Sequence, residues 1–142
     1  MGRKNSPSAN KELNELIAQY ETARAENRQL YLDGDQLADI ADQYAAGRKF
    51  NEAQEVITYG LHLHPDSTDL LVEQAYLYLD TGKIPLAKKV VESITDEYDT
   101  DVKMLKAELM LNEGQLENAR NVLDTIEDAD ELETIINKIG RA

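Results

Sequence analysis

The chain has 142 residues but contains no cysteine and no tryptophan, and it has only one phenylalanine. Without cysteine it can form neither a disulfide nor a zinc site built on thiolates. No apolar run reaches the roughly 18 to 20 residues that span a membrane, and the N-terminus has no apolar segment of a signal peptide. These absences favour a soluble, cytoplasmic domain stabilised by a hydrophobic core.

Basic residues are also scarce, because 15 Lys and Arg stand against 28 Asp and Glu. Nucleic-acid phosphates and anionic membranes would repel the formal charge of −13, so neither is expected as a partner. A chain of this length is expected to form one domain, burying roughly 70% of its unfolded surface in a globular core.

The apolar residues recur at helical spacing along nearly the whole chain. Residues 1–10 are polar and are expected to form a flexible tail. A helix is expected from residue 11, with Asn10 as its N-cap and with one apolar face made by Leu13, Leu16, Ile17, Tyr20 and Ala23. From residue 33 the helical pattern continues, and no stretch alternates apolar and polar residues as a half-buried strand would.

One apolar pattern occurs three times in this region, with steps of 34 and then 32 residues. The five recurring positions are Ala41, Ala75 and Ala107; Tyr44, Tyr78 and Met110; Phe50, Ile84 and Leu116; Ala53, Ala87 and Ala119; and Ile57, Val91 and Leu123. The alanines are expected where two helices approach closely, with the larger residues filling the space beside them. The second step is two residues shorter, and we expect the turn over residues 95–101 to absorb this loss.

Further positions of the pattern are Leu37, Ile40, Gly60 and Pro65 in the first copy and Leu71, Gln74 and Ile94 in the second. The third copy has Lys103 and Lys106 at two apolar positions, so its helix is expected to use Leu105 and Leu109. These residues resemble the tetratricopeptide repeat (TPR) family, whose unit of about 34 residues is a helix-turn-helix. Gly82 and Gly114 fall at the turn position where the family favours glycine, whereas Gly47 lies one residue early.

The resemblance implies an all-α fold, a right-handed α-solenoid of antiparallel helix hairpins with about three repeats and a flanking helix at each end. The expected helical domain spans residues 11–142 after the tail. Its segments are an N-terminal capping helix over 11–32, repeats over 33–67, 68–99 and 100–128, and a C-terminal helix or the start of a fourth repeat over 129–142.

The resemblance also implies a non-catalytic protein-binding or scaffold module, in which the first helix of each hairpin lines a concave groove. Carried over by position, the candidate groove residues are Asp35, Ala38, Asp42, Asp69, Val72, Tyr76, Leu79, Asp80, Met104, Glu108 and Leu111. The TPR subgroup that clamps a C-terminal carboxylate has Lys, Asn and Arg at such positions, so Ala38, Asp42 and Tyr76 argue against that activity. An acidic rim around apolar residues suits a basic or mixed basic and apolar partner. The alternative is that the apolar residues only pack between adjacent helices.

A second apolar stripe lies close to the end of the sequence. Its residues follow a plausible N-cap, Asp130, at helical spacing, and they are Leu132, Ile135, Ile136 and Ile139. The stripe resembles the first helix of a fourth repeat, so we favour a longer array or a homo-oligomer formed through this helix. The alternative is that this helix is a natural cap. Two alternative functions follow, a structural self-assembly module and a regulatory accessory domain of a longer protein.

No pattern of residues indicates catalysis, a metal site or a cofactor. His62 and His64 are two residues apart, so on a helix they point in different directions and cannot share a metal. The acids over residues 96–101 lack the glycine of a calcium loop, and no nucleophile elbow or phosphate loop occurs. Residues 92–133 hold 14 acids against three basic residues, a net charge of −11. They form either a solvated surface or a patch that steers a basic partner.

Overall fold

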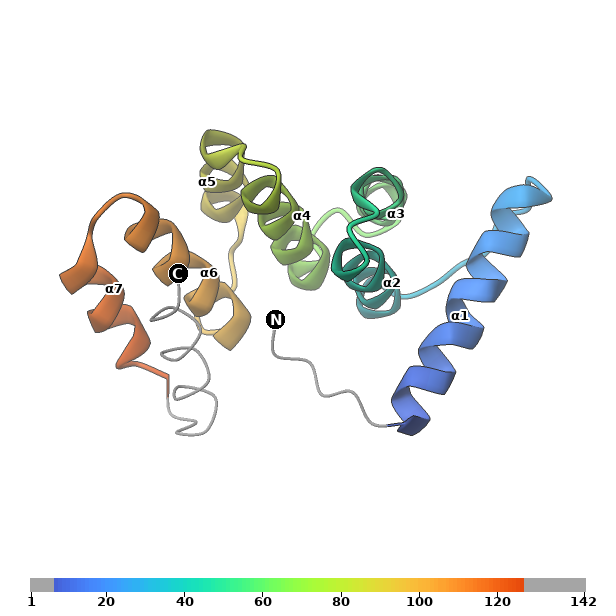
Figure 1. Cartoon of the computed structure of the whole chain (residues 1–142), viewed down its shortest axis with the longest axis horizontal. Helices are drawn as coiled ribbons and strands as arrows, with labels where there is room; N and C mark the ends of the chain where they lie inside the picture. Colours follow the sequence, from blue (N-terminus) through green and yellow to red (C-terminus); the bar gives the residue numbers. More distant parts are fainter. Residues whose placement is uncertain (1–6, 127–142) are drawn as a thin grey trace. The chain divides into compact units, whose positions relative to one another are not determined.

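The structure is a computed structural model that describes residues 7–126 (Figure 1). Those residues form α-helices and no strand, which confirms the all-α prediction. The helices are α1 (Pro7–Ala25), α2 (Gly34–Ala46), α3 (Phe50–Leu63), α4 (Thr68–Asp80), α5 (Ile84–Ser93), α6 (Thr100–Asn112) and α7 (Leu116–Leu123). The chain divides into two compact units, an N-terminal unit Met1–Glu73 and a C-terminal unit Gln74–Ala142, and the boundary falls within α4.

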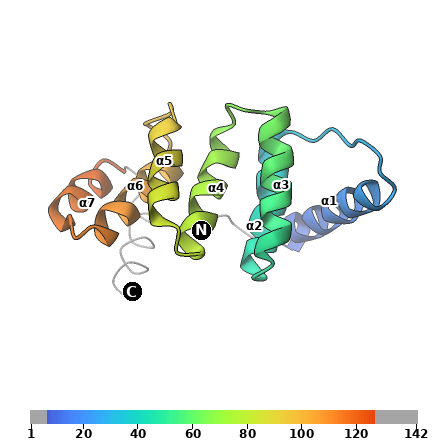
Figure 2. The same cartoon turned by 90° about the horizontal axis from the view of Figure 1, so that it is seen from above.

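The core of the N-terminal unit is the hairpin of α2 and α3, which lie side by side in Figures 1 and 2. Apolar residues at helical spacing bury themselves between the helices, and none of them is more than 1% exposed. They are Leu37, Ile40 and Ala41 on α2 and Ala53, Val56 and Ile57 on α3. α1 contacts α2, and its Tyr20 and Ala23 are buried too. Leu13, Leu16 and Ile17 of the predicted α1 face are half-buried, so that face is buried only in part.

Gly60 lets the start of α4 pack closely against α3. A Cβ atom at this position would lie 2.8 Å from Cδ1 of Leu70 and 3.4 Å from Cδ1 of Leu37. Both leucines are fully buried, so neither has room to move away. The glycine of the first repeat is thus a packing requirement.

The core of the C-terminal unit lies between α6 and α7. Met104 and Ala107 on α6 form a buried cluster with Ala119 and Leu123 on α7 and with Ile126. α5 contacts α6 and buries Ala87 and Val91. As expected from the third copy of the pattern, Leu105 and Leu109 are buried while Lys103 and Lys106 remain half-exposed.

Each hairpin turn closes with the same backbone hydrogen bond. The amide of Lys49 donates to the carbonyl of Tyr44 (2.8 Å), that of Lys83 to Tyr78 (2.7 Å), and that of Gln115 to Met110 (2.8 Å). This is the Schellman motif, which places the residue before the donor in the left-handed region.

Gly82 (φ 76°) and Gly114 (φ 77°) occupy this left-handed position in the second and third hairpins, but Arg48 (φ 61°) occupies it in the first. Gly47 lies one residue before this left-handed position. Its φ is −85°, so the turn does not require a glycine there.

The first helix of each hairpin also begins in a repeated way. Gln36 Oε1 accepts from the backbone N–H of Asp33 at 2.9 Å, one arm of a capping box at the start of α2. Ser67 Oγ accepts from the N–H of Leu70 at 3.3 Å, and Asp99 Oδ1 accepts from that of Val102 at 3.2 Å. Asp33, Ser67 and Asp99 follow the same steps of 34 and 32 residues, so the repeat extends to its capping residues.

Two helix boundaries differ from those expected. α1 begins at Pro7 rather than after Asn10, and proline is favourable in a first helical turn because its missing N–H has no partner there. α5 has 10 residues where α3 has 14, and it ends before the buried, extended residue Ile94. The prediction that the turn absorbs the two missing residues was wrong, because α5 loses a helical turn and the following connection is longer.

We expect Ala53→Leu and Ala87→Leu each to lower the free energy of unfolding by about 1 to 3 kcal/mol. Both alanines are 0% exposed, so the added atoms must displace packed neighbours. Urea denaturation measures the effect, and Ala46→Leu, at an exposed position at the end of α2, is the matched control. Equal midpoints for all three variants would show that these alanines are not close contacts.

A second prediction concerns the turns. Gly82→Ala and Gly114→Ala should each destabilise by about 1 kcal/mol, because alanine is strained at positive φ. No atom lies within 4 Å of the added Cβ at either position, so the backbone alone causes the loss. Gly47→Ala, at negative φ and with ordinary contacts, should be neutral or slightly stabilising in the same thermal melts. The opposite order would contradict the turn assignment.

Candidate functional site

The eleven predicted groove residues lie on α2, α4 and α6, the first helices of the hairpins. Asp35, Ala38, Asp42, Asp69 and Val72 belong to the N-terminal unit, and Tyr76, Leu79, Asp80, Met104, Glu108 and Leu111 belong to the C-terminal unit. Four of them are buried, namely Ala38, Val72, Tyr76 and Met104. Asp35 and Asp80 are exposed and the other five are half-buried. The accessible candidates are therefore acids in the N-terminal unit, and acids and leucines in the C-terminal unit.

Packing within the C-terminal unit accounts for part of its candidate set. Met104 belongs to the buried cluster between α6 and α7, and Leu111 packs against that cluster while remaining partly exposed. Leu79 and Leu111 stand at equivalent positions of α4 and α6, and both are half-buried. These two leucines are the apolar members of the C-terminal set that keep accessible surface.

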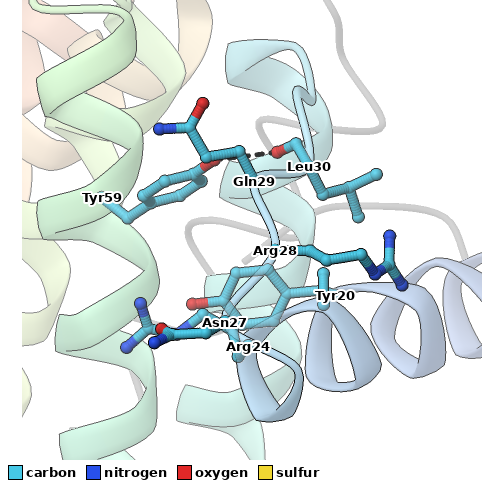
Figure 3. Close-up of a pocket in the computed structure, with 8 residues that line it drawn as sticks. Tyr20, Arg24, Asn27, Arg28, Gln29, Leu30 and Tyr59 are labelled. Atoms are coloured by element: carbon cyan, nitrogen blue, oxygen red, sulfur yellow. Dashed lines mark hydrogen bonds between the residues drawn. The ribbon is translucent and has the colours of Figure 1, made fainter.

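A pocket of about 260 Å³ lies at the C-terminal end of α1, within the N-terminal unit (Figure 3). A Schellman motif ends the helix there: the N–H of Arg28 donates to the carbonyl of Ala23 (2.8 Å), and that of Asn27 to Arg24 (3.2 Å). Asn27 has φ 59°, a region that asparagine tolerates better than most residues. The turn brings Arg24, Asn27 and Arg28 to the pocket, with Gln29 and Leu30 from the connection to α2.

Two tyrosines complete the pocket. Tyr59 on α3 donates its hydroxyl hydrogen bond to the carbonyl of Leu30 at 2.8 Å, and its ring lies 6.4 Å from that of Tyr20. The Tyr20 hydroxyl is buried, and no described atom is its hydrogen-bond partner. Burial raises the pKa of Tyr20, and the nearby positive charge of Arg24 lowers it by a smaller amount.

Sequence reasoning missed this pocket because its residues come from a helix end, an irregular connection and a distant helix. A charge signal was present in the sequence. Residues 1–30 hold five basic residues against four acids, a net charge of +1, whereas residues 31–142 hold ten against 24, a net charge of −14. Most of the residues that line the pocket therefore come from a segment without the acidic excess of the rest of the chain.

The two histidines have separate surroundings. His64 Nε2 lies 2.8 Å from the carbonyl oxygen of Leu32, and its ring meets the ring of Tyr31 edge-on, with centroids 5.4 Å apart. His62 is exposed. Within residues 7–126 no group of three or more His, Asp or Glu side chains is arranged to hold a metal. Over the same residues no helix is long and apolar enough to cross a membrane.

The predicted self-association stripe, Leu132, Ile135, Ile136 and Ile139, lies outside the described residues. Its homo-oligomer therefore stays a prediction from the sequence.

Tyr44 joins α2 to α1 by donating a hydrogen bond of 2.6 Å to Glu21 Oε2. Burial raises the pKa of Tyr44, and the hydrogen bond to the Glu21 carboxylate raises it further. The fold thus retains the phenolic proton above pH 10, where the unfolded tyrosine releases it. This contribution to stability is fully present below pH 10 and is lost as the pH rises above it.

We therefore expect the free energy of unfolding to fall above about pH 10, and to fall less steeply in Tyr44→Phe. Urea titrations at several alkaline pH values, on both proteins, measure the two slopes. Tyr98→Phe, at an exposed tyrosine, is the control and should keep the original slope. Equal slopes for Tyr44→Phe and the unaltered chain would show that Tyr44 does not cause the loss of stability at alkaline pH.

Comparison with known proteins agrees with these hairpins. The model of the tetratricopeptide repeat family matches residues 44–109, from the end of α2 into α6. No similar curated protein and no similar solved structure was found. Repeats of this family generally mediate protein–protein interaction, and the family is typically non-catalytic. The repeated hairpins and the match over residues 44–109 support a tetratricopeptide repeat helical protein.

Proposed function

We propose that this chain is a non-catalytic protein-binding or scaffold module whose first helices bind a basic, or mixed basic and apolar, segment of a partner protein. The observation that carries the proposal is the recurrence of acids at equivalent positions. Asp35, Asp69 and Asp101 stand in the first turns of α2, α4 and α6, two of them half-buried and Asp35 exposed. Asp42 and Glu108 share a second equivalent position, about two helical turns further along the same face.

The charge of the repeat region supports a basic partner. Residues 31–142 carry a net charge of −14, which raises the encounter rate with a cationic segment and disfavours anionic ones. Acids in a first helical turn also stabilise the helix through its dipole. That effect explains one acid per helix but not the second position, where Asp42 and Glu108 lie beyond the first turn.

The leucines give the proposed surface its apolar component. Leu79 and Leu111 retain accessible area at equivalent positions, and acids at 80 and 108 lie near them in sequence. Apolar anchors surrounded by charge are typical of peptide-binding surfaces. In this proposal the exposed and half-buried candidates contact the partner, and Ala38, Val72, Tyr76 and Met104 support them from below.

The test uses a dye-labelled peptide of alternating Lys and Leu and measures its fluorescence anisotropy with the full chain. We expect Asp35→Asn, Asp69→Asn and Asp101→Asn together to weaken binding about tenfold or more, because each first helix loses the charge of its first-turn acid. The control changes three exposed acids outside the first helices, Glu92→Gln, Asp96→Asn and Glu97→Gln. It removes the same charge and should change affinity less than threefold.

Circular dichroism of both triple variants checks that the helices persist. Equal weakening by the two triple variants would mean that the peptide responds only to net charge. Equal affinity for a Glu and Leu peptide of the same length would also reject a basic partner.

A further inference from the structure

The polar side chains of the pocket at the end of α1 are donors. Arg24, Arg28, Asn27 and Gln29 all carry N–H groups, and none of the described residues that line the pocket is acidic. In Figure 3 the Tyr20 hydroxyl points to the side where Arg24 and Asn27 lie, while the Arg28 guanidinium extends to the opposite side. The pocket is thus equipped for an oxyanion, although most of the chain is strongly acidic.

The Tyr20 hydroxyl is the polar atom that the fold leaves unsatisfied here. Tyr20 is 5% exposed, and none of the described atoms pairs with its hydroxyl. Buried hydroxyls without a partner are rare because folding strips their water without replacing it. A tyrosine hydroxyl keeps its proton at neutral pH, and burial raises the pKa of Tyr20 further, so the hydroxyl is available as a donor to a bound oxygen.

Carboxylates already approach both arginines in the free chain. Arg24 Nη2 lies 3.5 Å from Glu55 Oε2, and Arg28 Nε lies 3.4 Å from Glu26 Oε2. All four side chains are more than half exposed, so these ion pairs are weak and exchangeable. A ligand carboxylate that also reached the Tyr20 hydroxyl would have an advantage over Glu55.

A second pocket, of about 370 Å³, adjoins the first through Arg28 and Leu30 and is lined otherwise by Ala18, Gln19 and Thr22 of α1. Each pocket is near the lower end of the range for small-molecule sites, about 300 to 1,000 Å³. Two adjoining small pockets fit two side chains of an extended segment better than one compact ligand. Arg24 lines only the first pocket, and Arg28 lines both. Because the Arg28 guanidinium extends to the side opposite Arg24 in Figure 3, the two arginines suit two separate carboxylates better than one doubly charged phosphate.

We propose that these two pockets bind an acidic peptide segment of a partner protein, with one carboxylate at Arg24 and Tyr20 and a second at Arg28. The site goes beyond the proposed function, because its ligand has the opposite charge and its residues lie on α1, on α3 and in the connection between α1 and α2. The acidic repeats would repel such a segment elsewhere, so the +1 charge of residues 1–30 directs it to this end.

The test measures fluorescence anisotropy of a dye-labelled peptide of four glutamates with the full chain at low salt. We expect Arg24→Gln to weaken binding about tenfold and Tyr20→Phe several-fold, because each removes a donor to the carboxylate. Glu55→Gln should strengthen binding several-fold, because it removes the competing carboxylate. Lys11→Gln, an exposed charge on the same helix outside both pockets, is the control and should change affinity less than twofold.

Two further measurements test whether the site selects a peptide carboxylate. Inorganic phosphate at equal ionic strength should not displace the peptide, and a peptide of four lysines should not bind at this site. Absence of binding, equal losses for Arg24→Gln and Lys11→Gln, or displacement by phosphate alone would each overturn the proposal. Because Glu55→Gln predicts a gain, misfolding cannot imitate the expected result. The lysine and leucine peptide should bind the Arg24→Gln variant unchanged, so the two proposals fail independently.

Discussion

The close approach of paired helices is the constraint on which the rest of this structure depends. Ala53 on α3, Ala87 on α5 and Ala119 on α7 are almost completely buried, and the alanines at 41, 75 and 107 are too. Where a side chain ends at Cβ, the neighbouring helix can come near enough for larger residues beside it to interdigitate. Ile57, Val91 and Leu123, one turn after the first three alanines, complete each core. Gly60 extends the same logic to a position where even a methyl group does not fit.

This constraint is visible in the sequence, which is why so much of the fold could be predicted. Small residues recurring every 34 and 32 residues require repeated contacts, and the substitution of Leu105 and Leu109 for Lys103 and Lys106 follows from helical spacing alone. The turns that cap the helices could be predicted less completely from the sequence. Arg48 adopts the left-handed conformation because the amide of Lys49 must reach Tyr44, so a strong hydrogen-bond geometry overrides the residue preference. α5 ends early because Ile94 is buried in an extended conformation. The spacing of apolar residues does not predict this burial.

The binding surfaces were predicted less well than the core, for a physical reason. A buried position is defined by its own repeat, but a pocket is defined by which distant segments meet. Tyr20 and Tyr59 are 39 positions apart in the chain, and the Arg24 to Arg28 segment looks like an ordinary helix end. The expected groove residues were carried over by position, and burial now divides them into accessible acids and leucines above a buried layer. Charge adds a further distinction, since residues 1–30 carry a net charge of +1 and residues 31–142 a net charge of −14.

The connection between α1 and α2 has no regular structure, yet α3 and its C-cap residue His64 hold it at two alternate residues. The Tyr59 hydroxyl is bonded to the carbonyl of Leu30, and the His64 ring nitrogen pairs with the carbonyl of Leu32. Tyr44 adds a third bond, from α2 back to Glu21. Detaching α1 would therefore expose Tyr20 and Ala23 and break or strain these polar contacts together. An N-terminal helix usually frays on its own, but here its opening is coupled to that of the first hairpin, and the two behave as one cooperative folding unit.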